Sequence, residues 1–565
     1  MMVFSDDPQT AENQMHAIIF YLTAFGYIDG DFAPTEKTFV REYIKKLIQM
    51  RVHSALPDAD PAMRADLIEE YSGHFLEVFD KIDAGVKSLF TEAVSDDEDV
   101  QQFVYAKLKL RAFEIFKTFD EDNQRQLLET VHELIMADGV AHPSELQFRD
   151  EVMALLKSDI PLNESDLEAM QPAQLEVAAP ATRNPPPRLT NHPLFERVER
   201  HYSSNPDVLK QQAAADYKLI EATMMTWEDQ RRGHDGKLNG HQTVADFAGG
   251  KPFLDGHIYV HPTQPGQEYE LIVLGDLHGC YSCLKAAILQ SDFFGKVQAY
   301  KDNPDKHPNP KLVLLGDYID RGIFSYNGIL RTVMQLFVTA PEHVYVLRGN
   351  HEYYLEYKGR IFGGVKPAEA INTLERYMPI EMFKAYMKLF EDMPNMLLFD
   401  QFLFVHAGIP RDEALKEKWQ DLASLNDPDL RFQMMWSDPA DADFIPADLQ
   451  KGSRFPFGRL QFRSFMARLG ATTLVRGHEK IDEGFKKVYD DGVVVLLNLF
   501  SAGGATNNDL PPTSNYRNVT PMALTIKSKD GKHTATPWVI DWARYNDPAL
   551  NAFFQTRPEI QFKAD

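Results

Sequence analysis

Five short apolar segments of this 565-residue chain each run into polar or charged residues. One is LVLLGDYIDRG (312–322), in which four apolar residues, typical of a strand covered on both faces, are followed by Asp317, Asp320 and Arg321. The others are YELIVLGDLHG (269–279), VYVLRGNHE (344–352), FLFVHAG (402–408) and TTLVRGHE (472–479). Ligands of open α/β sheets bind beyond the carboxyl ends of the strands. Asp320 and Arg321 alone could be a surface pair that closes a turn, but the recurrence favours a site at one edge of a sheet.

The residues at these strand ends are of the types that bind metal ions: Asp276, His278, Asp317, Asn350, His406 and His478. No cysteine is among them, and mixed imidazole and carboxylate ligands suit Mn, Fe or Zn. Six ligands are too many for one tetrahedral ion and suit two ions about 3.5–4 Å apart that share a carboxylate. Asp317, which lies between the ligand groups in the sequence, is expected to be the bridge.

In this order the five segments resemble the motifs of the phosphoprotein phosphatase (Ser/Thr-type) branch of the calcineurin-like metallophosphoesterases, over about residues 269–502. The resemblance implies that Asp276 and His278 bind a first metal, that Asp317 bridges, and that a second metal is bound by Asn350, His406 and His478. It also implies that His351 is a general acid oriented by Asp320, and that Arg321 and Asn350 contact the phosphate.

The second phosphate-binding residue has two candidates. The segments MMWSDP (434–439) and GSRFPFG (452–458) resemble the region where the family has another arginine, and alignment on Phe457 and Gly458 puts Lys451 at that position. Arg454 is favoured because a bidentate phosphate contact needs a guanidinium. The tyrosine that the family has just beyond NLFSAGG (498–504) is missing, which leaves substrate preference open.

The expected fold class is α/β, a two-sheet metallophosphoesterase sandwich flanked by helices and preceded by an all-α domain. We expect a helical domain at 1–157, a linker rich in proline and alanine at 158–194, and a catalytic domain at 195–565. Helical spacing of apolar residues is found at 13–30, 41–50, 106–119 and 125–139.

The helical domain contains an internal repeat. DGDFAPTEKTF from Asp29 and DGVAHPSELQF from Asp138 share the Asp-Gly pair, a proline, a glutamate and a phenylalanine at the same spacing. This pattern resembles TerB-like domains. Glycine and glutamate at these places suit the end of one helix and the first turn of the next, although Asp29, Glu36, Asp138 and Glu145 could instead bind a cation. A domain of this kind is a candidate for binding a protein partner.

The net charge of −24 argues against general binding of nucleic acids or anionic membranes. The acidic start of the chain does not resemble a signal peptide, and no apolar run has the length of a membrane span. Only Cys280 and Cys283 are present, so a cytoplasmic location is expected. Their C-x-x-C spacing could form a redox pair but is better explained by packing at the start of a helix.

Together these features predict a phosphomonoester hydrolase with two divalent metal ions, Mn or else Fe or Zn. An activated hydroxide would attack phosphorus while His351 protonates the leaving oxygen. The expected substrate is a phosphoserine or phosphothreonine protein. A nucleotide substrate, such as a dinucleoside polyphosphate, is the alternative on the same site, and a non-catalytic scaffold stabilised by metals is the alternative of another class.

Overall fold

A computed structural model of the chain describes residues 4–5, 7–28, 32–57, 59–90, 94–95, 99–117, 119–135, 147–148, 151, 172–181, 187 and 189–563. The chain divides into two compact units. The first is Met1–Pro161 with Ala440–Gly452, and the second is Leu162–Pro439 with Ser453–Asp565.

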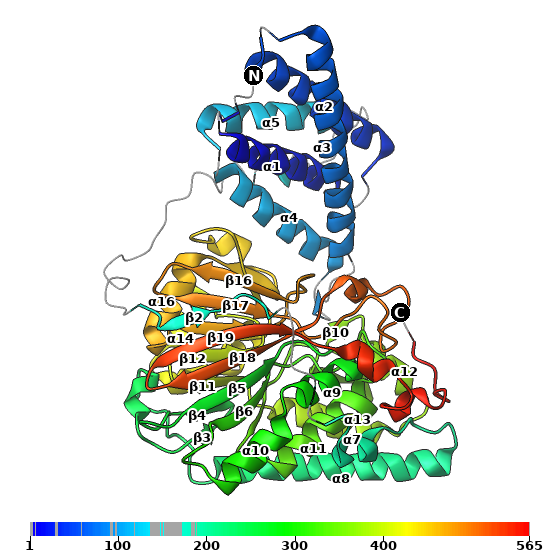
Figure 1. Ribbon diagram of the computed structural model, residues 1–565, viewed down its shortest axis with the longest axis vertical. Coiled ribbons are helices and arrows are strands. Elements are labelled where there is room, and N and C mark those ends of the chain that lie inside the picture. Colours follow the sequence, from blue (N-terminus) through cyan, green and yellow to red (C-terminus); the bar gives the residue numbers. More distant parts are fainter. Residues whose placement is uncertain are drawn as a thin grey trace. The chain divides into compact units, whose positions relative to one another are not determined.

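The first unit is helical, as expected (Figure 1). Its helices are α1 (Pro8–Gly26), α2 (Pro34–Ala55), α3 (Pro61–Leu89), α4 (Val100–Lys117) and α5 (Glu121–Ile135). Asp7 and Asp60 cap α1 and α3 by accepting hydrogen bonds from the backbone N–H groups of Thr10 and Ala62. Apolar residues of α1 form the centre of its core and are fully buried: Ile18, Ile19, Leu22 and Phe25.

The repeat in the helical unit is described only in part. Asp29, Asp138 and Glu145 lie outside the described residues. Glu36 is buried, and its carboxylate accepts a hydrogen bond of 2.8 Å from Ala33 N at the start of α2, which is a capping role. The resemblance to TerB-like domains stays a prediction.

The segment 440–452 belongs to the helical unit although it comes much later in the sequence. It joins two short parallel strands, β13 (Ser437–Pro439) and β14 (Phe455–Phe457). Four of its residues pack around Phe113 of α4: Ala440, Ala442, Ile445 and Leu449. The Glu114 carboxylate accepts a hydrogen bond from Asp441 N. The sequence contains no local sign of this packing.

The second unit contains two mixed sheets. The six-stranded sheet has the order β2 (Leu175–Val177), β19 (Lys532–Val539), β18 (Met522–Lys529), β5 (Tyr269–Leu274), β6 (Asn309–Leu314) and β7 (Val344–Val346). The seven-stranded sheet has the order β16 (Phe485–Asp490), β17 (Val495–Leu499), β15 (Thr473–Arg476), β12 (Phe402–Val405), β11 (Met396–Phe399), β4 (Ile258–His261) and β3 (Phe253–Asp255). One core includes buried residues of both sheets, such as Leu271, Val273, Phe404 and Leu497. The predicted two-sheet sandwich is therefore confirmed.

Helices cover the six-stranded sheet. Those drawn together beside it in Figure 1 include α7 (Pro193–Val198), α8 (Pro206–Arg231), α9 (Tyr281–Gln290), α10 (Phe293–Asp302), α11 (Arg331–Thr339), α12 (Glu369–Leu374) and α13 (Ile380–Asp392). The shorter α14 (Asp412–Lys418), α15 (Pro428–Met434) and α16 (Arg459–Leu469) belong to the same unit, as does the hairpin of β8 (Tyr354–Tyr357) and β9 (Arg360–Gly363). Arg331 of α11 binds Asp216 of α8 at 2.8 Å, so α8 braces this layer.

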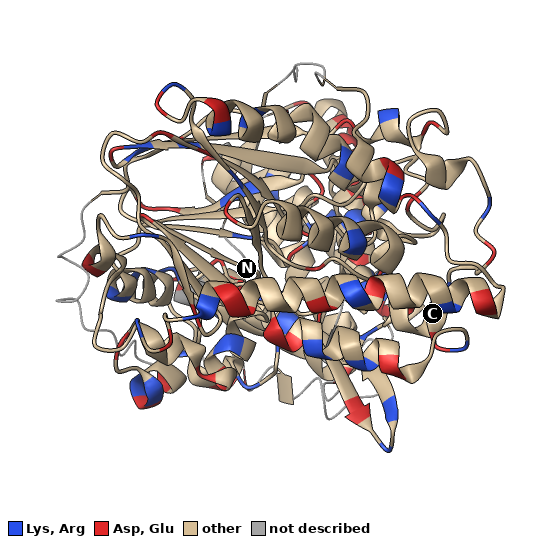
Figure 2. Ribbon diagram, turned by 90° about the horizontal axis from the view of Figure 1, so that it is seen from below, with Lys and Arg blue, Asp and Glu red and all other residues tan. Residues whose placement is uncertain are grey.

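Two further expectations concern this unit. Residues 175–177 of the expected linker form β2, which pairs with β19, while the domain boundaries stay a prediction. Cys280 and Cys283 are buried at the start of α9, where burial raises the pKa of the Cys280 thiol well above its usual value. Acidic and basic residues are interspersed along the helices and loops drawn in Figure 2. No helix within the described ranges is long and apolar enough to cross a membrane.

Candidate metal centre

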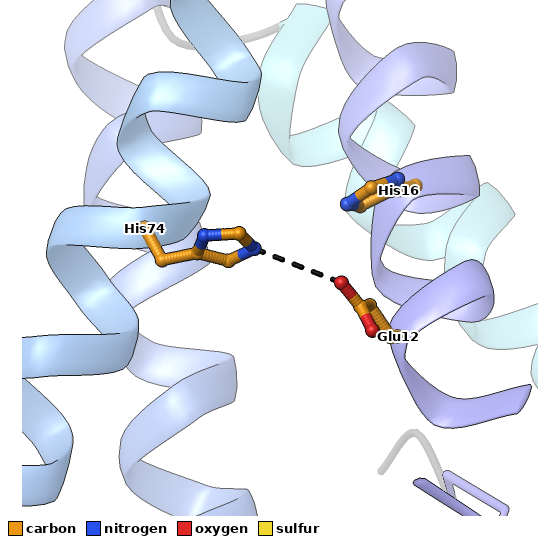
Figure 3. Close-up of side chains that lie close together, drawn as sticks. All are labelled: Glu12, His16 and His74. Carbon is orange, nitrogen blue, oxygen red and sulfur yellow. Dashed lines mark ion pairs between the residues drawn. The ribbon is translucent and has the colours of Figure 1, made fainter. Parts of the chain in front are cut away.

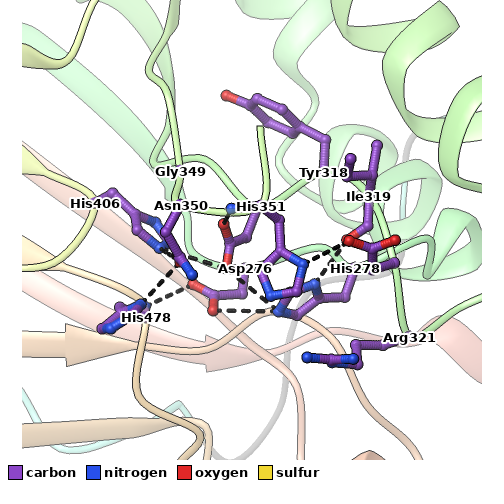
Figure 4. A network of polar contacts seen from close by, with 12 residues as sticks. Asp276, His278, Tyr318, Ile319, Arg321, Gly349, Asn350, His351, His406 and His478 are labelled. Carbon is purple, nitrogen blue, oxygen red and sulfur yellow. Dashed lines mark hydrogen bonds and ion pairs between the residues drawn. The ribbon is translucent and has the colours of Figure 1, made fainter. Parts of the chain in front are cut away.

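The six residues expected to bind metal come together at the strand ends. Asp276, Asp317 and Asn350 follow the parallel strands β5, β6 and β7 of one sheet, and His406 and His478 follow β12 and β15 of the other. The prediction that all of these residues lie at one edge of a single sheet was therefore wrong, because the five strands are divided between two sheets. His278 comes two residues after Asp276. All six are buried, and Figure 4 shows five of them by label around a common centre. These side chains are therefore placed by the short segments that directly follow the strands.

The backbone at this edge is strained. Positive φ angles occur at five non-glycine residues of the predicted site: His278 (40°), Asp317 (56°), Asp320 (68°), Arg321 (63°) and His478 (70°). Non-glycine residues adopt this region rarely and at a cost, and such residues cluster at functional sites. Holding these side chains at the site therefore costs conformational energy.

In both Asp276 and Asp317, one carboxylate oxygen accepts a backbone hydrogen bond, and the other oxygen can bind a metal ion. Asp276 Oδ1 accepts from His478 N at 2.8 Å, and Asp317 Oδ1 accepts from His351 N at 3.0 Å. A Cβ atom on Gly477 would lie 2.1 Å from Asp276 Oδ1, and one on Gly349 2.2 Å from Asp317 Oδ1. The glycines that precede His478 and Asn350 are therefore needed for the carboxylates to approach the backbone.

The free oxygen of Asp317 lies between two imidazoles. Its Oδ2 is 3.5 Å from His278 Nε2 and 3.4 Å from His406 Nε2, while His278 Nε2 is 3.6 Å from Asp276 Oδ2. Nδ1–H of His278 donates to Ile319 O at 2.9 Å, and Nδ1–H of His406 donates to Leu315 O at 3.1 Å. Because the proton of each ring is on Nδ1, the lone pair of each Nε2 is available to bind a metal.

Several polar atoms of the cluster lack the hydrogen bonds that buried groups need. Asp276 Oδ2, Asn350 Nδ2 and His478 Nε2 are buried and have no hydrogen-bond partner among the described residues. Asn350 Oδ1 lies 2.8 Å from His406 Nε2 and 3.0 Å from His478 Nδ1. Because His406 Nε2 carries a lone pair and no proton, it and Asn350 Oδ1 are two acceptors that face each other without a hydrogen between them. Neighbouring donor atoms on one ion, with bonds of roughly 2.1 Å, lie at such separations, so this set fits a metal.

Electrostatics supports the same conclusion. Burial raises the pKa of Asp276 to about 7, with the nearby Asp317 adding to the effect, and burial also raises the pKa of Asp317. Burial lowers the pKa of each imidazole in the cluster, namely those of His278, His351, His406 and His478. The protein alone therefore disfavours negative charge on its carboxylates, and bound cations would reverse this.

His351 is held by Asp320. Nδ1–H of His351 donates to Asp320 Oδ2 at 2.7 Å, and the other oxygen of Asp320 accepts from Ala370 N at 2.8 Å. The ring of His351 lies 4.7 Å from that of His278. His278, Asp317 and His351 also form a group whose ligand atoms are close enough for one ion. Position alone therefore permits His351 to be a ligand as well as an acid.

The phosphate-binding candidates differ in placement. Arg321 Nη1 donates to both oxygens of Glu369 at 3.0 and 3.1 Å, and Figure 4 shows Arg321 beside His278. Arg454 is buried in the second unit, with its Nε 2.6 Å from Asp438. Lys451 is exposed in the segment 440–452 of the first unit and pairs with Asp448. Arg454 thus shares a unit with the candidate centre, and Lys451 does not.

Sequence reasoning missed three residues of the site. The Glu352 carboxylate accepts from the N–H groups of Asp317 and Tyr318 at 2.7 and 2.8 Å, which fixes the strained loop, and burial raises its pKa. Its position at the end of VYVLRGNHE was a usable signal. Glu369 and Tyr516 are distant in sequence from the five segments and gave none.

Tyr516 lies near the candidate metal ligands. Its ring lies 5.4 Å from that of His278 and stacks on Phe500 at 5.4 Å. Burial raises the pKa of Tyr516, and the charge of Arg321 opposes this rise. A tyrosine is therefore present at the centre although none directly follows residues 498–504.

Comparison with known proteins finds similarity to one family over part of the chain. Residues 269–482 match the family model of the calcineurin-like phosphoesterases. The catalytic subunit of serine/threonine-protein phosphatase 6 from Caenorhabditis elegans is 28% identical over 233 residues, which are 40% of this chain and 62% of that protein. A probable serine/threonine-protein phosphatase of Encephalitozoon cuniculi is 26% identical over 43% of this chain and 48% of its own length.

Two solved structures show weaker similarity. A Saccharomyces cerevisiae protein serine/threonine phosphatase has a TM-score of 0.37 and 16% identity, over 57% of this chain and 89% of that one. A purple acid phosphatase from yellow lupin has a TM-score of 0.22 and 12% identity, over 51% and 56% of the two chains. The chain thus contains a region, residues 269–482, that matches the calcineurin-like phosphoesterases, and serine/threonine phosphatases are among the proteins to which it is similar.

Proposed function

We propose that the chain is a metal-dependent phosphomonoester hydrolase that acts on phosphoserine or phosphothreonine in proteins. The observation that carries this proposal is the arrangement of Asp276 and Asp317. Each carboxylate is anchored through one oxygen and directs the other, buried, toward imidazole nitrogens. Two observations support the choice of substrate. The relatives are named as serine/threonine phosphatases, and Asp320 precedes Arg321 in GDYIDRG.

The residues divide naturally between two divalent cations. Asp276 and His278 would hold one, the second would be held by Asn350, His406 and His478, and Asp317 would bridge. Mn²⁺ is the expected ion, with Fe and Zn as the alternatives. When bound, the pair would supply the positive charge that favours loss of a proton from the attacking water and offsets charge on the phosphoryl oxygens.

The chain's own groups complete the reaction. His351 would donate its Nε2 proton to the departing oxygen, while the bond from Nδ1 to Asp320 keeps the ring oriented and stabilises its charged form. Arg321 and Arg454 would bind the phosphate, and Asn350 would add an amide contact. Glu369 keeps the Arg321 guanidinium in place before substrate binds.

Two features outside the centre belong to the same proposal. The helical unit would bind a protein partner and so direct the catalytic unit to substrates. A cytoplasmic location is the expectation from the low cysteine content.

A side-by-side assay tests the function. The full chain, loaded with Mn²⁺, is offered phosphoserine peptides and dinucleoside polyphosphates at equal concentration, with Asp317→Asn as the inactive control. We expect a larger kcat/KM on the peptides. A larger value on the dinucleoside polyphosphates would assign a nucleotide substrate, and bound metal without hydrolysis of either would assign a scaffold.

A further inference from the structure

A second group of side chains of the types that bind metal ions lies in the helical unit, away from the proposed catalytic residues in sequence. Glu12 and His16 lie four residues apart on α1 and so share one face of the helix, and His74 faces them from α3 (Figure 3). The nearest ligand atoms of the three side chains all lie within 4.8 Å of one another. None of them has a part in the proposed phosphatase reaction.

The polar atoms of this group are not fully hydrogen-bonded to one another. His16 Nε2 is buried and has no hydrogen-bond partner among the described residues, although a buried polar atom left unpaired costs stability. His74 Nε2 is 3.7 Å from Glu12 Oε1, too far for a good hydrogen bond. The lone pairs of two imidazoles and a carboxylate therefore meet at one place without being used by one another.

Phe75 supports both rings. It packs edge-on against His16, with ring centroids 5.8 Å apart, and edge-on against His74 at 5.0 Å. These contacts limit the rotation of the imidazoles. The Glu12 and His74 side chains are 43% and 52% exposed, so both have room to move the short distance that coordination requires. Donor atoms of a tetrahedral site with bonds of about 2.1 Å lie roughly 3.4 Å apart.

The ligand chemistry selects the ion. Ca²⁺ and Mg²⁺ prefer sites made of oxygen atoms, whereas two imidazoles with one carboxylate form a common ligand set for Zn²⁺. We propose that Glu12, His16 and His74 form a Zn²⁺ site that joins α1 to α3 in the helical unit. A water would fill the fourth position. This site is independent of the proposed phosphatase function.

The test is elemental analysis of the full chain after saturation with Zn²⁺ and removal of free metal. We expect His74→Ala to bind one zinc per chain fewer than the wild type and to keep its phosphatase turnover with Mn²⁺. The matched control is His53→Ala, which changes a histidine on the neighbouring helix α2 that lies outside the group. It should bind as much zinc as the wild type.

A second variant guards against a folding defect in the first. Glu12→Gln keeps the size of the side chain and removes its charge, so it should also lose one zinc per chain. Equal zinc content in the wild type, His74→Ala and Glu12→Gln would overturn the proposal, whatever the activity of the catalytic unit. Loss of zinc in the His53→Ala control as well would also overturn it, because the loss would then not depend on this group.

Discussion

Replacing His351 with asparagine should impair hydrolysis in proportion to how poor the leaving group is. His351 is 3% exposed and its Nδ1 is bound to Asp320 at 2.7 Å, so its Nε2 is the one nitrogen left to deliver a proton. General acid catalysis is worth about 10²–10⁴-fold, or roughly 3–5 kcal/mol of transition-state stabilisation. We expect a loss of this size on a phosphoserine peptide, whose alkoxide leaves poorly, and a loss of less than about tenfold on p-nitrophenyl phosphate.

Asp320→Asn should show the same bias more weakly. It replaces one charge-assisted hydrogen bond, worth about 1.5–3 kcal/mol, and should therefore cost about 10–100-fold on the peptide. The assay is kcat/KM on both substrates with Mn²⁺, alongside metal analysis. His307→Asn, at an exposed histidine of the same unit, is the matched control. Equal losses on both substrates with the metal retained would refute the acid role, and loss of metal from His351→Asn would make His351 a ligand.

Three further outcomes follow from the centre. Asp317→Asn should lose most bound Mn²⁺ and nearly all turnover, and a full complement of metal by elemental analysis would refute the bridge. Burial raises the pKa of Asp276 to about 7, from about 3.9 when unfolded, so the folded metal-free protein holds the extra proton and loses stability as pH rises toward 7. The melting temperature of the metal-free wild type minus that of metal-free Asp276→Asn should therefore fall from about pH 4 to about pH 7. The comparison between the two proteins cancels the effect of the buried histidines, whose lowered pKa values act in the opposite direction. A difference that does not change with pH would contradict the shift. Arg454→Lys should raise the inhibition constant of phosphate by roughly tenfold, since it removes a bidentate contact, and Lys451→Ala should leave it unchanged; the reverse order would exchange their roles.

Local sequence predicted the strands and the residues that follow them because both depend on short segments. An apolar run such as residues 312–315 specifies a buried strand, and the residue after it lies at the sheet edge whatever the rest of the chain does. The glycines before Asn350 and His478 were visible as part of the motifs. Only the structure shows why these positions are glycines: a carboxylate oxygen lies where a Cβ atom would be.

The residues that were missed reach the site from other parts of the chain. Tyr516 follows a loop whose length removes it from its expected place, and Glu369 lies on a helix between the motifs. The edge strand at 175–177 is too short to show alternation, and the packing of 440–452 around Phe113 depends on contacts more than 300 residues apart. Such features arise from tertiary packing, which no local pattern records.

The most direct test of the dinuclear centre is anomalous scattering from crystals of the full chain grown with Mn²⁺. We predict two manganese peaks roughly 3.5–4 Å apart, with the Asp317 carboxylate between them, Asp276 and His278 on one ion, and Asn350, His406 and His478 on the other. A single peak, or two peaks of which neither contacts Asp317, would contradict the account.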